Sequence, residues 1–391
     1  MKYRKFGKLD WQVSVLGFGV MRLPLIDNNQ AQINEPEAMK MIHYAIDNGL
    51  NYIDTGYFYH GGQSEVFVGK ALKGGYQAKV KVATKMPCFA VKSADDFDRF
   101  FDEQLKRLDM PKIDFYLLHG LGAASWHRLR DLGIINWAEK KMAHGYFDNF
   151  AFSFHDEYPA FKEIIDSYDN WAFAQVQYNY MDVNRQAGIQ GVKYANAKNL
   201  GVVVMEPLRG GVLAKKPPES VAKVWEATQQ MSLAEWGLQW LWDQPEISVV
   251  LSGMSTMEQV QENMAAAERS EVGKFNQADL NLFERVREAY KNLYPIPCTG
   301  CRYCMPCPND VAIPSIFEIY NDGVAYNVAN WGRGRYIDSL LDGRRGDSCV
   351  QCNICVDACP QKIDIPDWLE KIHALLGTPG VPPHANPPKP K

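Results

Sequence analysis

The 391-residue sequence has almost no cysteine in its first three quarters. Cys88 is the only one before Cys298, and the remaining eight lie between Cys298 and Cys359. A secreted protein stapled by disulfides would not be arranged in this way. Dense clustering in steps of three residues, without an export signal, indicates metal ligation in a reducing compartment. We therefore expect a cytoplasmic protein.

The sequence also lacks a strong excess of one charge and any long apolar run. Its 42 Lys and Arg residues against 46 Asp and Glu residues give a net charge of −4, so no nucleic-acid partner is expected. No apolar run approaches the roughly 18 residues of a membrane span, so no membrane partner is expected. Residues 13–26 faintly resemble a signal peptide, but Arg22 and Pro24 interrupt them and no cleavage site follows. We interpret this stretch as the first strand region.

A third absence concerns the dinucleotide-binding signature. No Gly-x-Gly-x-x-Gly follows an early strand, which argues against an open doubly wound sheet. Over residues 1–270, short β-branched runs alternate with helical patterns at spacings that suit a (β/α)8 TIM barrel. Strands are predicted near Val13 and at 51–54, 79–85, 113–119, 148–153, 173–177, 201–205 and 247–251. Helices are predicted at 35–48, 94–108, 125–143, 186–198 and 232–242.

The composition divides the chain into four parts. Residues 1–275 are expected to form the barrel and residues 276–294 a connecting helix. Residues 295–376 are expected to form a small, mostly helical, ferredoxin-like module that holds the cysteines. Residues 377–391 are rich in proline, and we expect an extended tail.

In a barrel of this kind the chemistry lies at the carboxyl ends of the strands. The polar residues Asp54, Lys85, His119 and Ser153 end successive predicted strands, and Gln177 and Met205 close the next two. The segments 54–59 (DTGYFY), 64–65 (SE), 83–85 (ATK) and 117–119 (LLH) together resemble the aldo-keto reductase family.

The resemblance covers roughly residues 1–270. It implies carbonyl reduction with a nicotinamide cofactor on a (β/α)8 barrel, and it implies a catalytic tetrad of Asp54, Tyr59, Lys85 and His119. Asp54 and Tyr59 are five residues apart, as the family motif requires, so Tyr59 rather than Tyr57 is expected to donate the proton.

The roles expected for the tetrad residues also follow from the chemistry of carbonyl reduction. Reduction by hydride leaves an alkoxide that must be protonated, and an ordinary phenol, with a pKa of about 10, is a weak acid at neutral pH. We expect Lys85 to lower the pKa of Tyr59 and Asp54 to hold Lys85 charged and in place. His119 is expected to hydrogen-bond the substrate carbonyl and to orient it.

The resemblance also implies contacts to the cofactor. Ser153 and Gln177 would bind the nicotinamide amide, and Glu262 and Asn263 would lie at the adenine. Met205 stands where many members place an aromatic residue that stacks on the nicotinamide. It could take that place through its thioether, or it could simply fill the core.

The cofactor-phosphate segment departs from the family pattern. NADPH-dependent members carry a Lys and an Arg for the 2′-phosphate, and Gly253 and Gln259 occupy those positions here. Because two charge-assisted partners are missing, we expect little preference for NADPH over NADH. Arg209 or Arg269 could substitute for them.

The eight clustered cysteines form two runs, C-x-x-C-x-x-C-x-x-C-P and C-x-x-C-x-x-C-x-x-x-C-P. Three thiolates in steps of three surround a [4Fe–4S] cubane, and the fourth ligand comes from the other run. Zinc is the alternative, but it takes four ligands that usually form two pairs. The first predicted cluster is held by Cys298, Cys301, Cys304 and Cys359. The second is held by Cys349, Cys352, Cys355 and Cys307.

These patterns together predict an oxidoreductase with NAD(P)H-linked carbonyl reduction or alcohol oxidation, two [4Fe–4S] clusters and a small carbonyl or alcohol substrate. The clusters would connect the site to a one-electron partner, and a redox protein or a flavin would complete the path. Two alternatives stay open. The barrel could be an inert scaffold of an electron-carrier or partner-binding protein, or the clusters of a reductase could be purely structural.

Overall fold

The computed structural model describes residues 1–226, 231–338, 340 and 343–377. The chain divides into two compact units. The first comprises Met1–Ala214 and Met231–Asn276, and the second comprises Lys215–Gln230 and Gln277–Lys391. Each unit is described separately below. No helix among the described residues is long and apolar enough to cross a bilayer.

Eight parallel strands of the first unit form a closed barrel in the order β10-β3-β4-β5-β6-β7-β8-β9. Every strand pairs with the next one along the chain, and β10 pairs with both β9 and β3. The predicted (β/α)8 barrel is thereby confirmed. The strands are β3 (Leu16–Gly19), β4 (Tyr52–Asp54), β5 (Lys81–Met86), β6 (Ile113–Leu121), β7 (Phe147–Phe154), β8 (Phe173–Gln177), β9 (Gly201–Met205) and β10 (Val249–Ser252).

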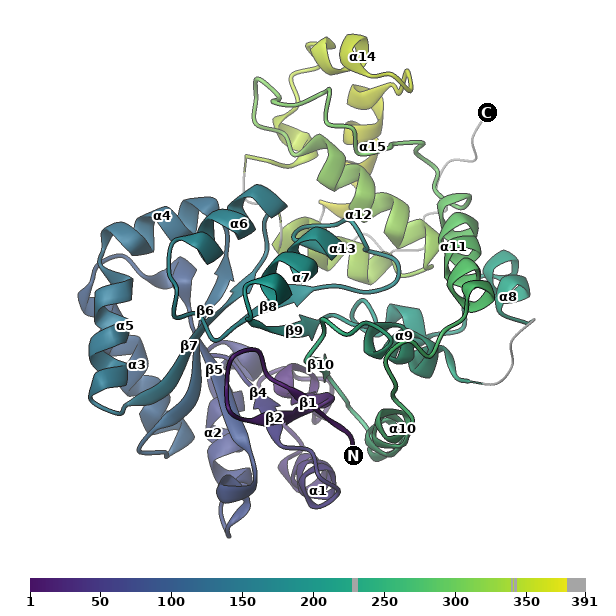
Figure 1. The fold of residues 1–391 in the computed structure, drawn as a ribbon. Coiled ribbons are helices and arrows are strands. Elements are labelled where there is room, and N and C mark those ends of the chain that lie inside the picture. The colour runs from purple at the N-terminus through teal and green to yellow at the C-terminus, as the bar shows by residue number, and fades with distance from the viewer. Residues whose placement is uncertain (227–230, 339, 341–342, 378–391) are drawn as a thin grey trace. The chain divides into compact units, whose positions relative to one another are not determined.

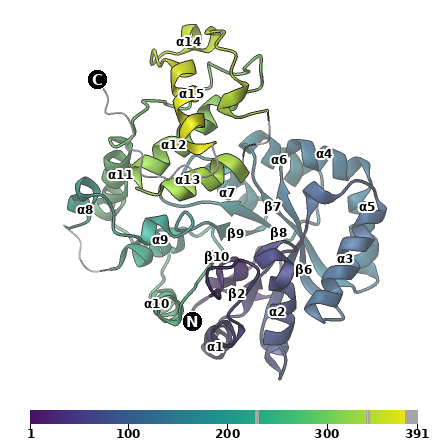
Figure 2. The ribbon, with the colours of Figure 1, turned by 180° about the vertical axis from the view of Figure 1, so that it is seen from behind.

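Helices cover the outside of these strands, as two opposite views show (Figure 1, Figure 2). In α1 (Glu35–Asp47), apolar residues at helical spacing are buried, and Asn48 caps the helix before Gly49, whose φ is 93°. The other helices of this unit are α2 (Gln63–Ala71), α3 (Asp95–Leu108), α4 (Ala123–Asp131), α5 (Ile134–Ala143), α6 (Tyr158–Asp166), α7 (Gly188–Ala197), α9 (Leu233–Trp242) and α10 (Met257–Glu268).

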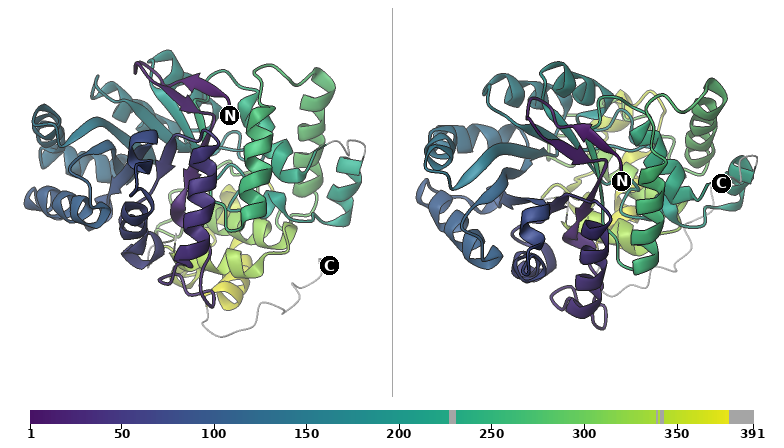
Figure 3. Two further views of the ribbon diagram at one scale, coloured as in Figure 1. Left: turned by 90° about the horizontal axis from the view of Figure 1, so that it is seen from below. Right: turned by 60° about the horizontal axis from the view of Figure 1, so that its bottom comes forward.

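Two predictions for this unit were wrong in detail. The single helix predicted at 125–143 is two helices, α4 and α5, because Gly133 between them has a φ of 86° that an α-helix cannot contain. Val13 lies outside the barrel wall, in β2 (Gln12–Ser14), which pairs antiparallel with β1 (Tyr3–Lys5). This hairpin closes one end of the barrel (Figure 3), and Phe6 packs there among the inward-facing rings of Tyr52, Phe115 and Phe173.

The second unit is mostly helical. Its apolar core contains Ile316, Tyr336 and Leu369, and several of the clustered cysteines pack against it. Its helices are α8 (Glu219–Trp225), α11 (Gln277–Lys291), α12 (Ile313–Ala325), α13 (Ala329–Asp338), α14 (Ile354–Ala358) and α15 (Ile365–Leu376). The predicted proline-rich tail lies, from residue 378 on, outside the described residues.

Candidate functional site

Three strand ends and one turn bring the predicted tetrad together. Asp54 is the last residue of β4, Lys85 lies in β5 and His119 in β6, while Tyr59 begins the short 3-10 helix η2 (Tyr59–Gly62). The ammonium nitrogen of Lys85 lies 2.5 Å from Asp54 Oδ1 and 3.2 Å from Tyr59 Oη. The ring of His119 stands edge-on to the Tyr59 ring, with centroids 5.7 Å apart. All four side chains therefore share one end of the barrel.

Lys85 is the central group of this arrangement. Its side chain is buried, and the ammonium also donates to the backbone oxygen of Thr55 at 2.6 Å. Burial by itself disfavours the charged ammonium, but Asp54 and Tyr59 stabilise it and raise the pKa of Lys85 above its usual value. Lys85 therefore carries its positive charge at neutral pH directly beside the phenol oxygen.

We expected the pKa of Tyr59 to lie below its usual value. The effect of Lys85 has the expected direction, but the net shift of the pKa is upward. The Lys85 ammonium does lower this pKa, but burial of the phenol is the larger effect and raises it, and the Asp54 carboxylate also raises it. The phenol consequently keeps its proton at neutral pH. Lys85 is placed to stabilise the phenolate once the proton has left, which is the requirement for a proton donor.

His119 is a neutral imidazole in this setting. Burial and the nearby charge of Lys85 lower its pKa to about 3. Its Nδ1 atom is buried and has no hydrogen-bond partner among the described residues. A neutral ring at this position can donate a hydrogen bond to a carbonyl oxygen, but it does not compete with Tyr59 as an acid.

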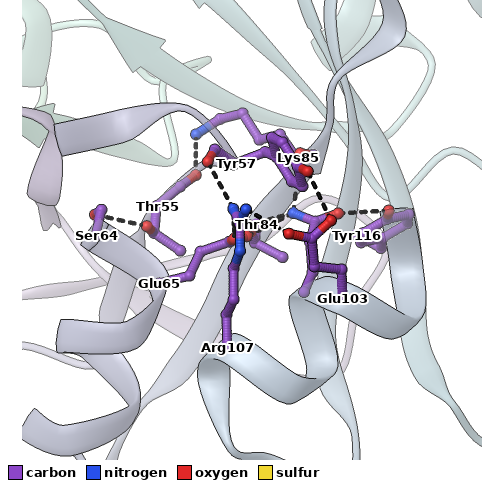
Figure 4. A network of polar contacts seen from close by, with 10 residues as sticks. Thr55, Tyr57, Ser64, Glu65, Thr84, Lys85, Glu103, Arg107 and Tyr116 are labelled. Atoms are coloured by element: carbon purple, nitrogen blue, oxygen red, sulfur yellow. Dashed lines mark hydrogen bonds and ion pairs between the residues drawn. The ribbon is translucent and has the colours of Figure 1, made fainter. Parts of the chain in front are cut away.

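A second layer of polar side chains, whose contacts the sequence did not reveal, holds Lys85 and the loop before Tyr59 (Figure 4). Its centre is Glu65 of α2, which is fully buried and accepts hydrogen bonds from Thr84 Oγ1 and Gln104 Nε2 at 2.5 Å each. Gln104 also donates to the backbone oxygen of Lys85. Arg107 of α3 pairs with Glu65 at 3.3 Å and donates to the backbone oxygen of Tyr57. The layer thus connects two helices to two strand ends.

Tyr57 points into this second layer. Its hydroxyl donates to Glu103 at 2.7 Å, and its ring lies under the guanidinium of Arg107. Tyr59, by contrast, makes its polar contact with Lys85. The different surroundings of the two phenols favour the choice of Tyr59 made from the motif spacing.

The residues expected at the nicotinamide amide end the adjoining strands β7 and β8. Ser153 Oγ accepts a hydrogen bond from the backbone of Gly120, which leaves its proton available for donation. Gln177 donates to Asp182, and its Oε1 atom is buried without a partner among the described residues. A buried acceptor of this kind fits a carboxamide N–H group. Met205 is the last residue of β9 and packs, partly buried, against the barrel interior.

The segment expected at the adenine end satisfies its own hydrogen bonds. Asn263 is buried and donates to Ser252 Oγ at 3.0 Å, and Glu262 accepts from Ser232. Gln259, which stands at one of the family's basic positions, accepts from the backbone of Ser255. Gly253, at the other, lies against the side chain of Arg22.

The two arginines considered as substitutes are both engaged by carboxylates. Arg209 is buried and forms a two-pronged ion pair with Asp182, with N···O distances of 2.9 and 3.1 Å. Arg269 pairs in the same way with Glu235, at 2.9 Å for both contacts. Both guanidinium groups therefore already have a carboxylate partner, and Arg209 is in addition buried.

The eight clustered cysteines line two neighbouring cavities of the second unit. Each cavity is bordered by the four thiols predicted for its cluster. Cys304 and Ile313 border both cavities, so one of them is lined by a fifth cysteine. One cavity is lined by Cys298, Cys301, Cys304 and Cys359. The other is lined by Cys307, Cys349, Cys352 and Cys355, together with Cys304.

The donor set and its spacing fit iron–sulfur cubanes. Among the described residues, no three Cys, His, Asp or Glu side chains converge closely enough to hold a single metal ion. The thiols line two spaces whose remaining walls are largely apolar, with Ile313 in both and Leu369 in one. A tetrahedral zinc site would bring four sulfurs to about 2.3 Å from one ion.

Comparison with known proteins finds two family matches along the chain. Residues 15–288 match the Aldo/keto reductase family, and residues 297–363 match the 4Fe-4S dicluster domain. L-galactose dehydrogenase from Arabidopsis thaliana is 26% identical over 321 residues, which span 75% of this chain and 96% of the relative. Probable aldo-keto reductase 1 from Glycine max is 35% identical over 123 residues, which span 29% of this chain and 35% of the relative.

Solved structures of aldo-keto reductases have the same barrel. The holo form of an enzyme from Bacillus halodurans aligns with a TM-score of 0.61 and 25% identity, over 73% of this chain and 96% of that one. An enzyme from Klebsiella pneumoniae in complex with NADPH aligns with a TM-score of 0.58 and 21% identity, over 73% of this chain and 95% of that one. The second match concerns the fold alone.

Proposed function

Because the chain belongs to the aldo/keto reductase family and carries a 4Fe-4S dicluster domain, we propose that this oxidoreductase reduces a small carbonyl compound with a nicotinamide cofactor, or oxidises the matching alcohol. One observation carries the proposal. A buried, charged lysine contacts both a carboxylate and a phenol hydroxyl, and a neutral imidazole stands beside that phenol. This set of groups suits the protonation of an alkoxide.

In the proposed reaction the cofactor supplies the hydride, and side chains of this protein supply the proton and stabilise the charge. The reduced nicotinamide, when bound, supplies a hydride to the carbonyl carbon. His119 donates a hydrogen bond to the carbonyl oxygen, and Tyr59 gives that oxygen its proton as the negative charge develops. Lys85 stabilises the resulting phenolate, Asp54 holds Lys85, and water returns a proton to Tyr59. The sum is one hydride and one proton added across the carbonyl bond.

The residues that would hold the cofactor lie at the ends of β7, β8 and β9 and in α10. Ser153 and Gln177 would bind the carboxamide through the hydroxyl proton and the unpartnered Oε1 atom. Asn263 and Glu262 would lie at the adenine, and Met205 would lie beside the nicotinamide ring. Because Gly253 and Gln259 stand where NADPH-dependent members of the family carry a Lys and an Arg, we expect NADH to be used at least as readily as NADPH.

Substitution of Tyr59 tests this assignment. We expect Tyr59→Phe to bind nicotinamide almost as the parent does and to reduce carbonyl compounds about 10²-fold or more slowly, the size of a general-acid effect. Tyr57→Phe is the matched control, because its hydroxyl contacts Glu103 in the second layer, and its loss should be mild. Equal losses from both variants, or none from Tyr59→Phe, would show that the tetrad is misassigned.

In this proposal the clusters exchange single electrons with a redox partner. The cysteine thiolates that hold them suit a reducing, cytoplasmic setting. Two adjacent cavities that share Cys304 favour this role, since a purely structural staple would need only one cluster. A hydride carries two electrons whereas a cubane accepts one, so a flavin or a partner protein is needed for efficient exchange between them.

The redox role has its own test. Substrate or cofactor, added anaerobically to the oxidised protein, should produce the paramagnetic signal of a reduced cluster during turnover. The control is a Cys349→Ala, Cys352→Ala variant, in which the residues of the barrel unit are unchanged. If this variant turns over at the parent rate, and the parent never shows the signal, the clusters are structural.

A further inference from the structure

A buried ion pair contacts the amide group of Gln177 at the end of β8. Gln177 Nε2 lies 2.7 Å from Oδ2 of Asp182, which is in the loop after β8. Arg209, in the turn after β9, donates to both oxygens of this carboxylate. The side chains of Gln177, Asp182 and Arg209 are all buried. Two strand-end loops therefore bring an acid and a base to one side of this amide.

The carboxylate of Asp182 determines how the Gln177 amide is oriented. An ionised carboxylate only accepts hydrogen bonds, so the amide nitrogen, and not the amide oxygen, must face it. Asn179 Nδ2 and Arg209 Nε donate to the same Oδ2 atom, at 2.9 and 3.1 Å. The Oε1 atom of Gln177 is buried without a partner among the described residues. Rotation of the amide by 180° would bring two oxygens together, so Oε1 is held away from Asp182.

Further contacts hold the loops that carry the ion pair. Asn179 Oδ1 accepts from the backbone nitrogens of Met181 and Asp182, at 3.0 Å each. Asn179 Nδ2 also donates to the backbone oxygen of Glu206 at 3.2 Å, which connects the two loops. Arg209 has a φ of 52°, which is uncommon for a residue other than glycine. A buried ion pair is weak evidence for a role in stability, because apolar residues of similar volume can often replace it.

We propose that Asp182 and Arg209 are positioning residues, which hold the amide of Gln177 with Oε1 towards the cofactor and thereby select a nicotinamide ring whose substituent carries an N–H group. The inference rests on the proposed function, because it assumes that the nicotinamide lies at Ser153 and Gln177. A carboxamide donates an N–H to Oε1 and accepts the Ser153 hydroxyl proton through its oxygen. An acetyl group in the same place has no N–H, so it leaves the buried Oε1 acceptor unpaired, which is unfavourable.

The test compares the binding of NADH with that of its reduced 3-acetylpyridine analogue, by calorimetric titration of the full-length protein under anaerobic conditions. We expect the parent to bind NADH about tenfold or more tightly than the analogue. The variant Asp182→Leu, Arg209→Met removes both charges and frees the Gln177 amide, which can then turn Nε2 towards the acetyl oxygen. This affinity ratio should therefore fall to about threefold or less. General loosening of the site would weaken both ligands alike and leave the ratio unchanged.

Gln177→Leu is the reference variant, because it removes the acceptor itself. Its affinity ratio should fall at least as far, and the addition of Asp182→Leu and Arg209→Met to it should change the ratio no further. Circular dichroism shows whether the variants are folded. If Asp182→Leu, Arg209→Met does not fold, Asp182→Asn, Arg209→Gln takes its place. An asparagine amide can present either a donor or an acceptor to Gln177, so the ratio should fall here as well.

Failure of this inference is distinguishable from failure of the proposed function. If the parent protein binds no reduced nicotinamide, the proposed function is wrong. If the parent binds both ligands equally, or if Gln177→Leu keeps the parent ratio, Oε1 does not accept from the cofactor and the inference is overturned. If Gln177→Leu loses the ratio but the folded variant without both charges keeps it, Asp182 and Arg209 do not orient Gln177.

Discussion

Replacement of Lys85 by methionine separates the structural from the catalytic role of the central ion pair. The ammonium lies 2.5 Å from Asp54 Oδ1, and the two side chains are only 1% and 4% exposed. Lys85→Met keeps most of the side-chain volume but leaves the Asp54 carboxylate buried without its partner. Removal of one partner from a buried pair costs about 3–5 kcal/mol. We expect the free energy of unfolding of the barrel to fall by that amount.

Lys81→Met is the matched control on the same strand. Lys81 lies 3.1 Å from Asp114, but these side chains are 31% and 22% exposed. A solvent-screened pair of this kind is worth about 0–1 kcal/mol. The double variant Asp54→Asn, Lys85→Met should recover most of the stability lost in Lys85→Met, because no unpaired charge remains. It should not recover carbonyl reduction, because the phenolate of Tyr59 still lacks the ammonium.

Urea unfolding without cofactor, under anaerobic conditions, measures these differences. Tryptophan fluorescence and circular dichroism follow the protein, while visible absorption follows the clusters and so identifies unfolding of the second unit. The reasoning is refuted if Lys85→Met is no less stable than Lys81→Met, or if the double variant is no more stable than Lys85→Met.

Three further predictions concern metal content, cofactor choice and pH. Anaerobically purified protein should contain about eight iron and eight labile sulfide per chain, as two cubanes require; zinc without visible absorption near 400 nm would contradict the cluster assignment. Fluorescence titration should show that NADPH binds no more tightly than NADH. A hundredfold preference for NADPH would mean that another residue binds the 2′-phosphate. Arg22, which lies against Gly253, would be the first candidate. The pKa of His119 is about 3 in the folded protein, below its usual 6.5, so the unfolded chain binds more protons and stability falls as pH decreases from about 6.5 towards 3. A His119→Gln variant should lose less stability than the parent between pH 6.5 and 4.5, by up to about 2 kcal/mol, and an equal loss would contradict the neutral ring.

Much of the barrel could be predicted because its strands are short, apolar and separated by amphipathic helices. The range predicted for β8 agrees with the structure at both ends, and so does that for β9. The break between α4 and α5 was missed because the apolar periodicity continues across Gly133, whose backbone conformation alone separates the helices. The β1–β2 hairpin was missed because Val13 and Leu16 read as one apolar run, although only the second belongs to the barrel.

The tetrad could be predicted because each strand-borne member closes a predicted strand, and parallel strands in a barrel end at one rim. The layer behind it could not. Glu65 and Arg107 are 42 residues apart and meet only because α2 packs on α3, and a lone glutamate in a helix is normally solvated. The direction of the pKa shift of Tyr59 was misjudged for a related reason. Burial of the phenol is the larger effect, and no local sequence pattern indicates that burial.

The most direct test of the central claim is a single turnover with NADH that carries deuterium at both C4 positions, mixed anaerobically with the protein and an aldehyde. If the barrel transfers hydride directly and Tyr59 supplies the proton, one deuterium per turnover will appear on the carbinol carbon of the product, and Tyr59→Phe will form that product about 10²-fold more slowly or worse. If the electrons instead reach the substrate through the clusters, the alcohol will carry hydrogen from water and the deuterium will be lost to solvent. That result would contradict the assignment of the tetrad as the site of reduction.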